Sequence, residues 1–169
     1  STVRSSGITI KSRKELDFMR QAGQVVAYVK AKVADAIIPG VTTLGLDRIA
    51  EQEIRKLGAE PSFKGYMGFP ASICVSLNEQ IVHGIPGERT IREGDIISVD
   101  VGAIVGGFHG DSAFTMGVGS ISDEAQRLID ATQKSLWCGI DSVRSGARVG
   151  KVSAAIQAYA EGQGYSVVR

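Results

Sequence analysis

The chain has 169 residues, of which 43% are hydrophobic and 22% are charged, with a formal net charge of +1. This composition is typical of a globular domain with a sizeable core. The near-neutral charge gives no electrostatic reason to expect nucleic acid or an anionic membrane as a partner. The sequence contains no apolar run of the roughly 20 residues that cross a bilayer. Cys74 and Cys138 are too few for a disulfide framework, and we expect a cytoplasmic protein.

Two amphipathic helices are predicted in the first third of the chain. Ser12 opens a capping-box pattern with Glu15, and apolar residues then recur at helical spacing until Pro39. A second helix is predicted over residues 43–57. Gly58 follows it at the position of a left-handed C-terminal cap.

The middle of the chain changes to short apolar runs separated by turn residues, which indicates strands. The predicted strands are ASICVSL (71–77), QIVHGI (80–85), DIISVDVGAIV (95–105) and DSAFTMGV (111–118). After Ser122-Asp123 the helical spacing returns, which predicts a long helix as far as Val143.

Residues 145–166 resemble residues 39–60 when the two segments are aligned. Gly40 then lies over Gly146 and Gly58 over Gly164, with apolar positions of the two predicted helices in register. The order of elements is also the same. We interpret this as an internal duplication, and a doubled architecture predicts a further set of strands after Arg169.

Two aspartates lie in the apolar stretch IISVDVGAIVGGFHGDSAF, residues 96–114. In an antiparallel hairpin, a tight turn between Val105 and Gly106 places Asp100 directly opposite Asp111. A two-residue loop of Gly106 and Gly107 makes the two aspartates diagonal neighbours instead. Both arrangements keep the carboxylates on one face of the sheet, about 5 Å apart or somewhat more.

Two carboxylates that close together need a compensating group in order to stay ionised. The ordinary interpretation is an arginine partner or a capped backbone group. A shared proton is less well supported, because nothing nearby indicates an aspartic protease. A dinuclear metal site suits the geometry, and oxygen ligands with histidine favour manganese, iron, cobalt or zinc. Further ligands are then required, and the rest of the chain does not visibly supply them.

Two histidines are the other candidates for chemistry. His83 ends a predicted strand just before a glycine and a proline turn, where it is either a solvated residue or a positioned one. His109, in GGFHGD, points with Asp111 by strand alternation, which would suit a third ligand. A turn histidine that bonds to the backbone is the better interpretation.

The segment SFKGYMGFPASICV concentrates apolar side chains just before and within a strand. Such a cluster is mostly core, and it can also line a pocket. Cys74 by itself is more often a small buried side chain than a nucleophile. The cluster consists of Phe63, Tyr66, Met67, Phe69 and Cys74.

Three segments together resemble the type I methionine aminopeptidases: PGVTTLGLD, GYMGFPASICVSLNEQIVHGIPG and GDIISVDVGAIVGGFHGDSAFTMGVG. The resemblance runs from residue 8 to residue 169, about the N-terminal two thirds of one catalytic domain, after a flexible leader or remnant of added sequence over residues 1–7. It implies the pita-bread fold, an α/β arrangement. In this fold an antiparallel sheet carries helices on its outer face, and a pseudo-twofold duplication places the metal site between two halves.

The resemblance also implies roles for single residues. Asp100 matches an aspartate that chelates one metal ion, and Asp111 matches the aspartate that bridges two. His83 matches the catalytic histidine that contacts the substrate near its scissile amide. The positions that line the methionine pocket are matched by Phe63, Tyr66, Phe69 and Cys74, although Phe69 stands where a tyrosine is common and Phe63 where a cysteine occurs.

The implied reaction is removal of the initiator methionine from nascent chains and peptides with a small second residue, by a hydroxide that bridges two divalent metal ions. The family's remaining ligands, a histidine and two glutamates, and a second catalytic histidine follow the segment GYSVVR. We therefore expect this chain to be inactive without a C-terminal half. The alternatives are a proline-directed peptidase of the same fold and a non-catalytic binding module.

Overall fold

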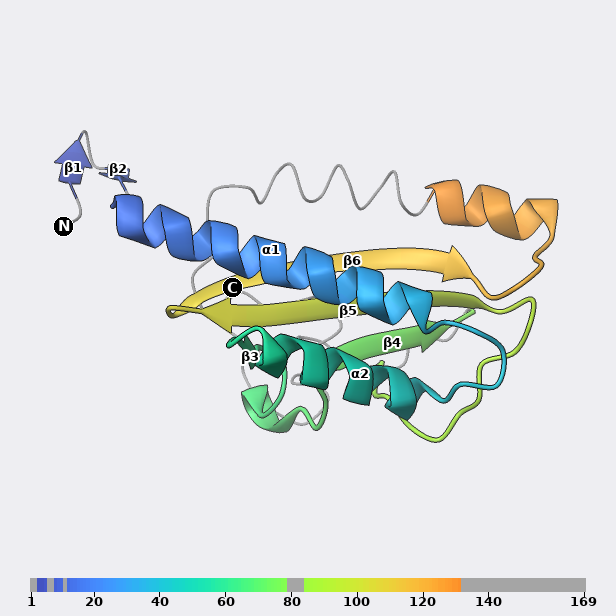
Figure 1. The fold of residues 1–169 in the computed structure, drawn as a ribbon. Helices are drawn as coiled ribbons and strands as arrows, with labels where there is room; N and C mark the ends of the chain where they lie inside the picture. The colour runs from blue at the N-terminus through green and yellow to red at the C-terminus, as the bar shows by residue number, and fades with distance from the viewer. Residues whose placement is uncertain (1–2, 6–7, 11, 79–83, 132–169) are drawn as a thin grey trace.

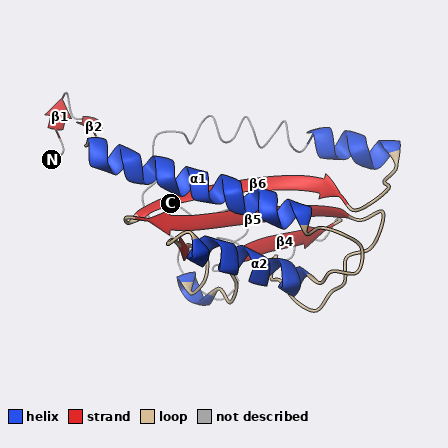
Figure 2. Ribbon diagram, in the orientation of Figure 1, coloured by secondary structure: helices blue, strands red, loops and turns tan. Residues whose placement is uncertain are grey.

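The computed structural model describes residues 3–5, 8–10, 12–78 and 84–131. Most of these residues form two layers, with helices α1 (Arg13–Asp35) and α2 (Thr43–Lys56) lying across one face of an antiparallel sheet (Figure 1). Figure 2 shows both helices in front of the strands. The predicted α/β class is confirmed.

The first helix begins where the capping pattern predicted. The Ser12 hydroxyl accepts a hydrogen bond from the backbone N–H of Glu15 at 3.2 Å, which satisfies one of the free N–H groups at the helix start. The helix then buries Val26, Val29 and Val33, which recur at helical spacing. One face of α1 is therefore part of the core.

The second helix also has the predicted ends. The Thr42 side chain caps its start by accepting a hydrogen bond from the backbone N–H of Gly45 at 3.0 Å. Beyond its last residues, Gly58 has a φ of +77°, which is the left-handed conformation predicted for it.

Strand β5 (Ile96–Val105) is the centre of the sheet. Along one edge it pairs over its whole length with β6 (Phe108–Gly117). Along its other edge it pairs first with β4 (Ile73–Leu77) and then, farther along, with β3 (Glu60–Pro61). All three pairings are antiparallel, as predicted for this sheet.

The hydrophobic core lies between this sheet and the two helices. Ile97, Val99 and Val101 alternate along β5, are at most 1% exposed, and belong to the same core cluster as the buried residues of α1 and α2. Because strand side chains alternate, the residues between them point to the opposite side. We call that side, which faces away from α1 and α2, the far face.

The turn between β5 and β6 decides the register of the hairpin. Gly106 and Gly107 both have positive φ, +57° and +82°, as a two-residue type I′ turn requires. Val105 then pairs with Phe108 across the turn. The two-residue loop, one of the two predicted alternatives, is the one that forms.

Some elements differ from the sequence prediction. The predicted flexible leader contains strand β1 (Val3–Ser5), which pairs with β2 (Ile8–Ile10). Strand β3 and the 3₁₀ helix η1 (Tyr66–Gly68) were not predicted, because elements of two and three residues show no periodicity. Strand β6 begins at Phe108, three residues before its predicted start.

Several predictions lie outside the described residues. The predicted strand over residues 80–85 falls mostly there, and its last two residues, Gly84 and Ile85, are not in a strand. A helix over residues 123–131 lies within the predicted long helix, the rest of which falls outside the described residues, as does the predicted second copy of the duplication, 145–166. None of the helices in the described ranges combines the length and apolar character needed to cross a membrane.

Candidate metal centre and apolar pocket

Asp100 and Asp111 lie on adjacent strands of the far face. Asp100 pairs with Ala113, and Asp111 pairs with Gly102. Paired residues point to the same side of an antiparallel sheet, so the two aspartates are diagonal neighbours on one face. Direct opposition, the other predicted alternative, does not occur.

The surroundings of Asp111 leave its carboxylate accessible. Its side chain is 47% exposed, and its Oδ2 lies 3.8 Å from Nε2 of His109, beyond hydrogen-bond distance. No lysine or arginine of the described ranges forms an ion pair with Asp111. The predicted arginine partner for this carboxylate is therefore not found among these residues.

His109 lies within β6 and not in a turn, which corrects the sequence interpretation. Its side chain is 4% exposed, and its ring centroid lies 6.3 Å from that of Phe63. Its Nε2 atom is buried and has no hydrogen-bond partner within the described part of the chain. A buried nitrogen without a partner costs free energy unless a ligand or another group completes its bonding.

An apolar cluster stands beside the aspartates. Its buried members come from the segment that precedes β4 and from the strand itself, as the sequence predicted, but the predicted member Met67 is not among them. Cys74 joins it from β4, where it pairs directly with Asp100. The cluster consists of Phe63, Phe69, Ala71 and Cys74, with the half-buried Tyr66 packed against it.

Gly102 brings this cluster close to the carboxylates. A Cβ atom at position 102 would lie 2.7 Å from Cε1 of Phe63 and would also clash with the Ser62 hydroxyl. Phe63 therefore occupies the space over the residue that pairs with Asp111. Only glycine permits so close an approach within a strand.

Residues 62–72 form an excursion from the sheet edge. Pro61 pairs with Ala103 and Ile73 pairs with Val101, so the chain leaves β5 and returns to it on either side of Gly102. We call residues 62–72 the pocket excursion, because they carry Phe63, Tyr66 and Phe69.

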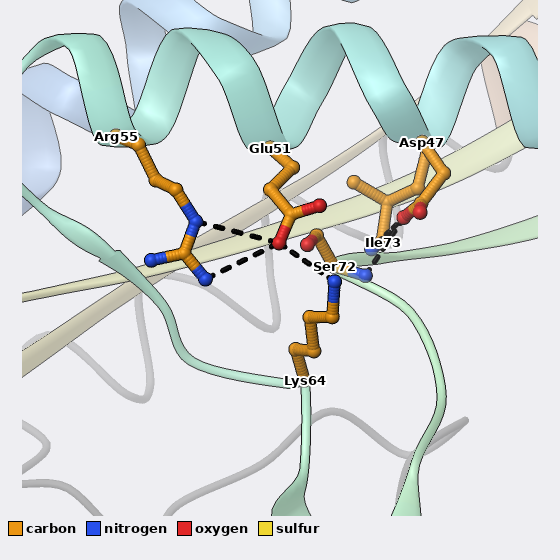
Figure 3. A network of polar contacts seen from close by, with 6 residues as sticks. All are labelled: Asp47, Glu51, Arg55, Lys64, Ser72 and Ile73. Carbon is orange, nitrogen blue, oxygen red and sulfur yellow. Dashed lines mark hydrogen bonds and ion pairs between the residues drawn. The ribbon is translucent and has the colours of Figure 1, made fainter.

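The pocket excursion is tied to helix α2 at two points, shown in Figure 3. Asp47 Oδ1 accepts hydrogen bonds from the backbone N–H groups of Ser72, at 2.7 Å, and Ile73, at 3.0 Å. Glu51, one turn later, accepts a bond from Lys64 at 2.7 Å and is also paired with Arg55 at 3.2 Å.

The two carboxylates have opposite electrostatic environments. Burial raises the pKa of Asp47 above its usual value, and the hydrogen bonds from Ser72 and Ile73 offset this only in part. The hydrogen bond from Lys64 holds the pKa of Glu51 below its usual range.

The far face supplies some of the ligands that a divalent metal site needs. Asp100 and Asp111 supply hard oxygen donors at neighbouring positions, as metals bound through carboxylates require. No group of three or more potential metal-binding side chains occurs within the described ranges.

His83, the predicted substrate contact, lies outside those ranges. A surface cavity lined by Arg89, Thr90, Arg92 and Asp95 contains none of the predicted site residues.

Sequence reasoning missed Asp47 and Gly102, although each carries a signal. Asp47 follows Leu46 on the predicted helix, immediately beside the apolar face that buries Ala50, where a charged residue needs a partner. Gly102 stands inside an apolar strand, where a glycine often marks close approach of other groups. Neither signal identifies the partner.

Comparison with known proteins identifies the family of this chain. A family model described as metallopeptidase family M24 matches residues 17–169. The chain belongs to metallopeptidase family M24. The paired carboxylates of the far face agree with a family of metal-dependent peptidases.

The M24 relatives of this chain include methionine aminopeptidases. This chain is 51% identical over 162 residues to methionine aminopeptidase 1 of Bacillus subtilis, a match that covers 96% of this chain and 65% of the relative. The crystal structure of a methionine aminopeptidase from Thermotoga maritima superimposes with a TM-score of 0.74 at 38% identity, covering 92% of this chain and 63% of that one. The predicted resemblance and the pita-bread fold are confirmed.

Proline-directed members of the same fold are more distant. A Xaa-Pro dipeptidase from Bacillus anthracis matches with a TM-score of 0.65 and 26% identity, covering 78% of this chain and 36% of that one. The chain also spans somewhat less than two thirds of the B. subtilis relative's length, 65%.

Proposed function

We propose that this chain carries part of the active site of a methionine aminopeptidase, which removes the N-terminal methionine from nascent chains and peptides with a small second residue. The observation that carries the proposal is the diagonal pair of Asp100 and Asp111 beside a buried aromatic cluster. The 51% identity to methionine aminopeptidase 1 of B. subtilis supports methionine as the substrate residue.

In this proposal Asp100 and Asp111 hold two divalent metal ions, with cobalt, manganese, iron and zinc as the candidates. When bound, such ions polarise the scissile carbonyl and activate water. The Asp111 carboxylate would be accessible to such an ion, because its side chain is 47% exposed and its Oδ2 lies beyond hydrogen-bond distance of Nε2 of His109. The remaining ligands, a histidine and two glutamates by the family resemblance, come from the C-terminal half that follows GYSVVR.

The chain's other residues bind and orient the substrate. The cluster of Phe63, Tyr66, Phe69 and Cys74 receives the methionine side chain. Burial of that side chain contributes about 25 cal/mol for each Å² of apolar surface that is removed from water. His83 contacts the substrate near the scissile amide. The cluster residues set which first residue is accepted, whereas His83 and the two aspartates serve the chemistry.

We further propose that the chain alone is inactive. Two carboxylates leave each metal ion short of protein ligands, so metal affinity is weak, and the two like charges repel each other. The apolar surface and strand edge that a second half would cover then favour association. The partner that completes the site is the C-terminal half of the domain.

The test compares two proteins. One is the 169-residue chain, and the other is the joined protein, in which the chain is followed by the part of the B. subtilis relative that the match leaves uncovered. Each is assayed for methionine release from a Met-Ala-Ser peptide with added manganese or cobalt. We expect turnover in the joined protein only, and loss of both turnover and metal binding on Asp111→Ala.

The outcomes separate the alternatives. Sustained turnover by the chain alone that disappears on Asp111→Ala would show that it builds its own site. Cleavage of Xaa-Pro peptides in preference to Met-Ala-Ser would favour a proline-directed peptidase. Metal binding without any cleavage by the joined protein would favour a non-catalytic module.

A further inference from the structure

Helix α2 holds both ends of the pocket excursion from one face. Asp47 and Glu51 are four residues apart, so their side chains emerge one turn apart on the same side of the helix. Glu51 bonds to Lys64 near the start of the excursion, and Asp47 bonds to the backbone at its end. Figure 3 shows the two carboxylates pointing from α2 towards these two segments.

The bond made by Asp47 is the stronger restraint on the backbone. The residue is 6% exposed, and a single oxygen, Oδ1, receives both the Ser72 and the Ile73 N–H groups. Loss of this acceptor would leave two buried N–H groups without a partner, which is unfavourable. This contact restrains the backbone where it enters β4.

Between the two anchors the backbone is unusual. Gly65 and Gly68 have φ values of +84° and +79°, and Met67 between them also has a positive φ, +49°. A non-glycine residue in this conformation is strained and persists only where its surroundings impose it. Tyr66 and Phe69, on either side of Met67, belong to the apolar cluster.

We propose that Asp47, assisted by Glu51, is a positioning residue for the methionine pocket: it holds the pocket excursion so that Phe63, Tyr66 and Phe69 meet the substrate side chain beside the two aspartates. This inference rests on the proposed function for the identity of the ligand. The anchoring itself rests on the contacts that Asp47 and Glu51 make from α2.

The position of the anchors predicts an effect on binding rather than on chemistry. Asp100 and Asp111 lie on β5 and β6, which are paired over their whole length, and neither strand depends on the pocket excursion for its register. Loosening the excursion therefore disturbs the pocket and leaves the aspartates in place. A loss of that kind raises KM and leaves kcat nearly unchanged.

The test uses Asp47→Ala and Asp47→Asn in the joined protein. Alanine removes the acceptor, whereas asparagine keeps one side-chain oxygen for the same two N–H groups. The matched control is Asp35→Ala, at an exposed aspartate in the last turn of α1. Each variant is measured for KM and kcat on Met-Ala-Ser, and for hydrogen exchange of the peptide that contains Ser72 and Ile73.

We expect Asp47→Ala to raise KM about tenfold with kcat within about twofold of the wild type. The exchange of the Ser72 and Ile73 amides should accelerate about tenfold or more, because their acceptor is gone. Asp47→Asn should restore most of both properties, and Asp35→Ala should change neither. Glu51→Gln should have a smaller effect in the same direction, since it weakens a partly exposed contact.

Two results would overturn the inference. One is an Asp47→Ala protein that keeps wild-type KM and wild-type exchange at Ser72 and Ile73. The other is a variant in which kcat falls as much as KM rises while thermal unfolding is unchanged, which would give Asp47 a role in the chemistry. If the joined wild-type protein releases no methionine, the proposed function fails, but the exchange measurement still decides whether Asp47 anchors the excursion.

Discussion

Asp111 stands directly across the β5–β6 ladder from Gly102, and Asp100 is its diagonal neighbour. The residue opposite a candidate metal ligand therefore has no side chain, and Phe63 fills the space above it. One glycine thus places the apolar cluster next to the carboxylates. Its substitution provides the first test of this geometry.

We expect Gly102→Ala to destabilise the joined protein and to displace Phe63. The added methyl group would meet the Phe63 ring at 2.7 Å, and overpacking of this kind costs about 1–3 kcal/mol. Urea unfolding measures the free energy. Gly23→Ala is the control, because a Cβ at that helical position meets nothing within 4 Å and should stabilise the protein by about 0.5–1 kcal/mol. Equal effects of the two substitutions would contradict the close approach.

Removing one carboxylate of the far face should separate charge repulsion from metal binding. Without metal, the joined protein with Asp111→Asn should be as stable as the joined wild-type protein or more stable by at most about 1 kcal/mol. The reason is that one of two like charges is removed. With manganese added, only the wild type should show a marked rise in melting temperature, since binding to the native state stabilises it. An equal rise in Asp111→Asn and in Asp100→Asn would exclude both residues as ligands.

The two carboxylates of α2 should respond to pH with opposite signs. The pKa of Glu51 is lowered in the folded protein, so its contribution is present above its unfolded pKa of 4.5 and is lost as the pH falls through the folded value. The pKa of Asp47 is raised, so its contribution is full below 3.8 and declines as the pH rises through the folded value.

Urea unfolding between about pH 3 and pH 7 tests this pair of signs. The stability advantage of the wild type over Glu51→Gln should grow as the pH rises through the low folded pKa of Glu51 towards 4.5. Its advantage over Asp47→Asn should shrink as the pH rises through the raised pKa of Asp47. Parallel pH profiles for the two variants would contradict the opposite environments of these carboxylates.

The turn of the β5–β6 hairpin offers a comparison between adjacent glycines. Gly106 and Gly107 both have positive φ, so alanine at either position should cost roughly 1–2 kcal/mol. A Cβ at Gly106 would also lie 2.5 Å from the Phe18 ring, whereas one at Gly107 meets nothing within 4 Å. Gly106→Ala should therefore be the more destabilising variant in thermal unfolding. The reverse order would show that Phe18 moves away without cost.

The sequence alone determined the elements with strong local signals. The Ser12 cap, the two helices and the long strands follow from hydrogen-bonding side chains and apolar spacing, which act between residues near one another in the chain. Strand alternation also showed that Asp100 and Asp111 share a face, because either even-length turn has that consequence.

Only the tertiary structure decided how these elements meet. The sequence allowed two hairpin registers, one with the aspartates directly opposed and one with them diagonal. The way in which Gly106 and Gly107 close the turn selects the diagonal arrangement. The bonds from Asp47 to Ser72 and Ile73 join residues about twenty-five positions apart and have no periodic signal. Contacts of that kind depend on packing across the sheet edge, where chain separation carries no information about distance in space.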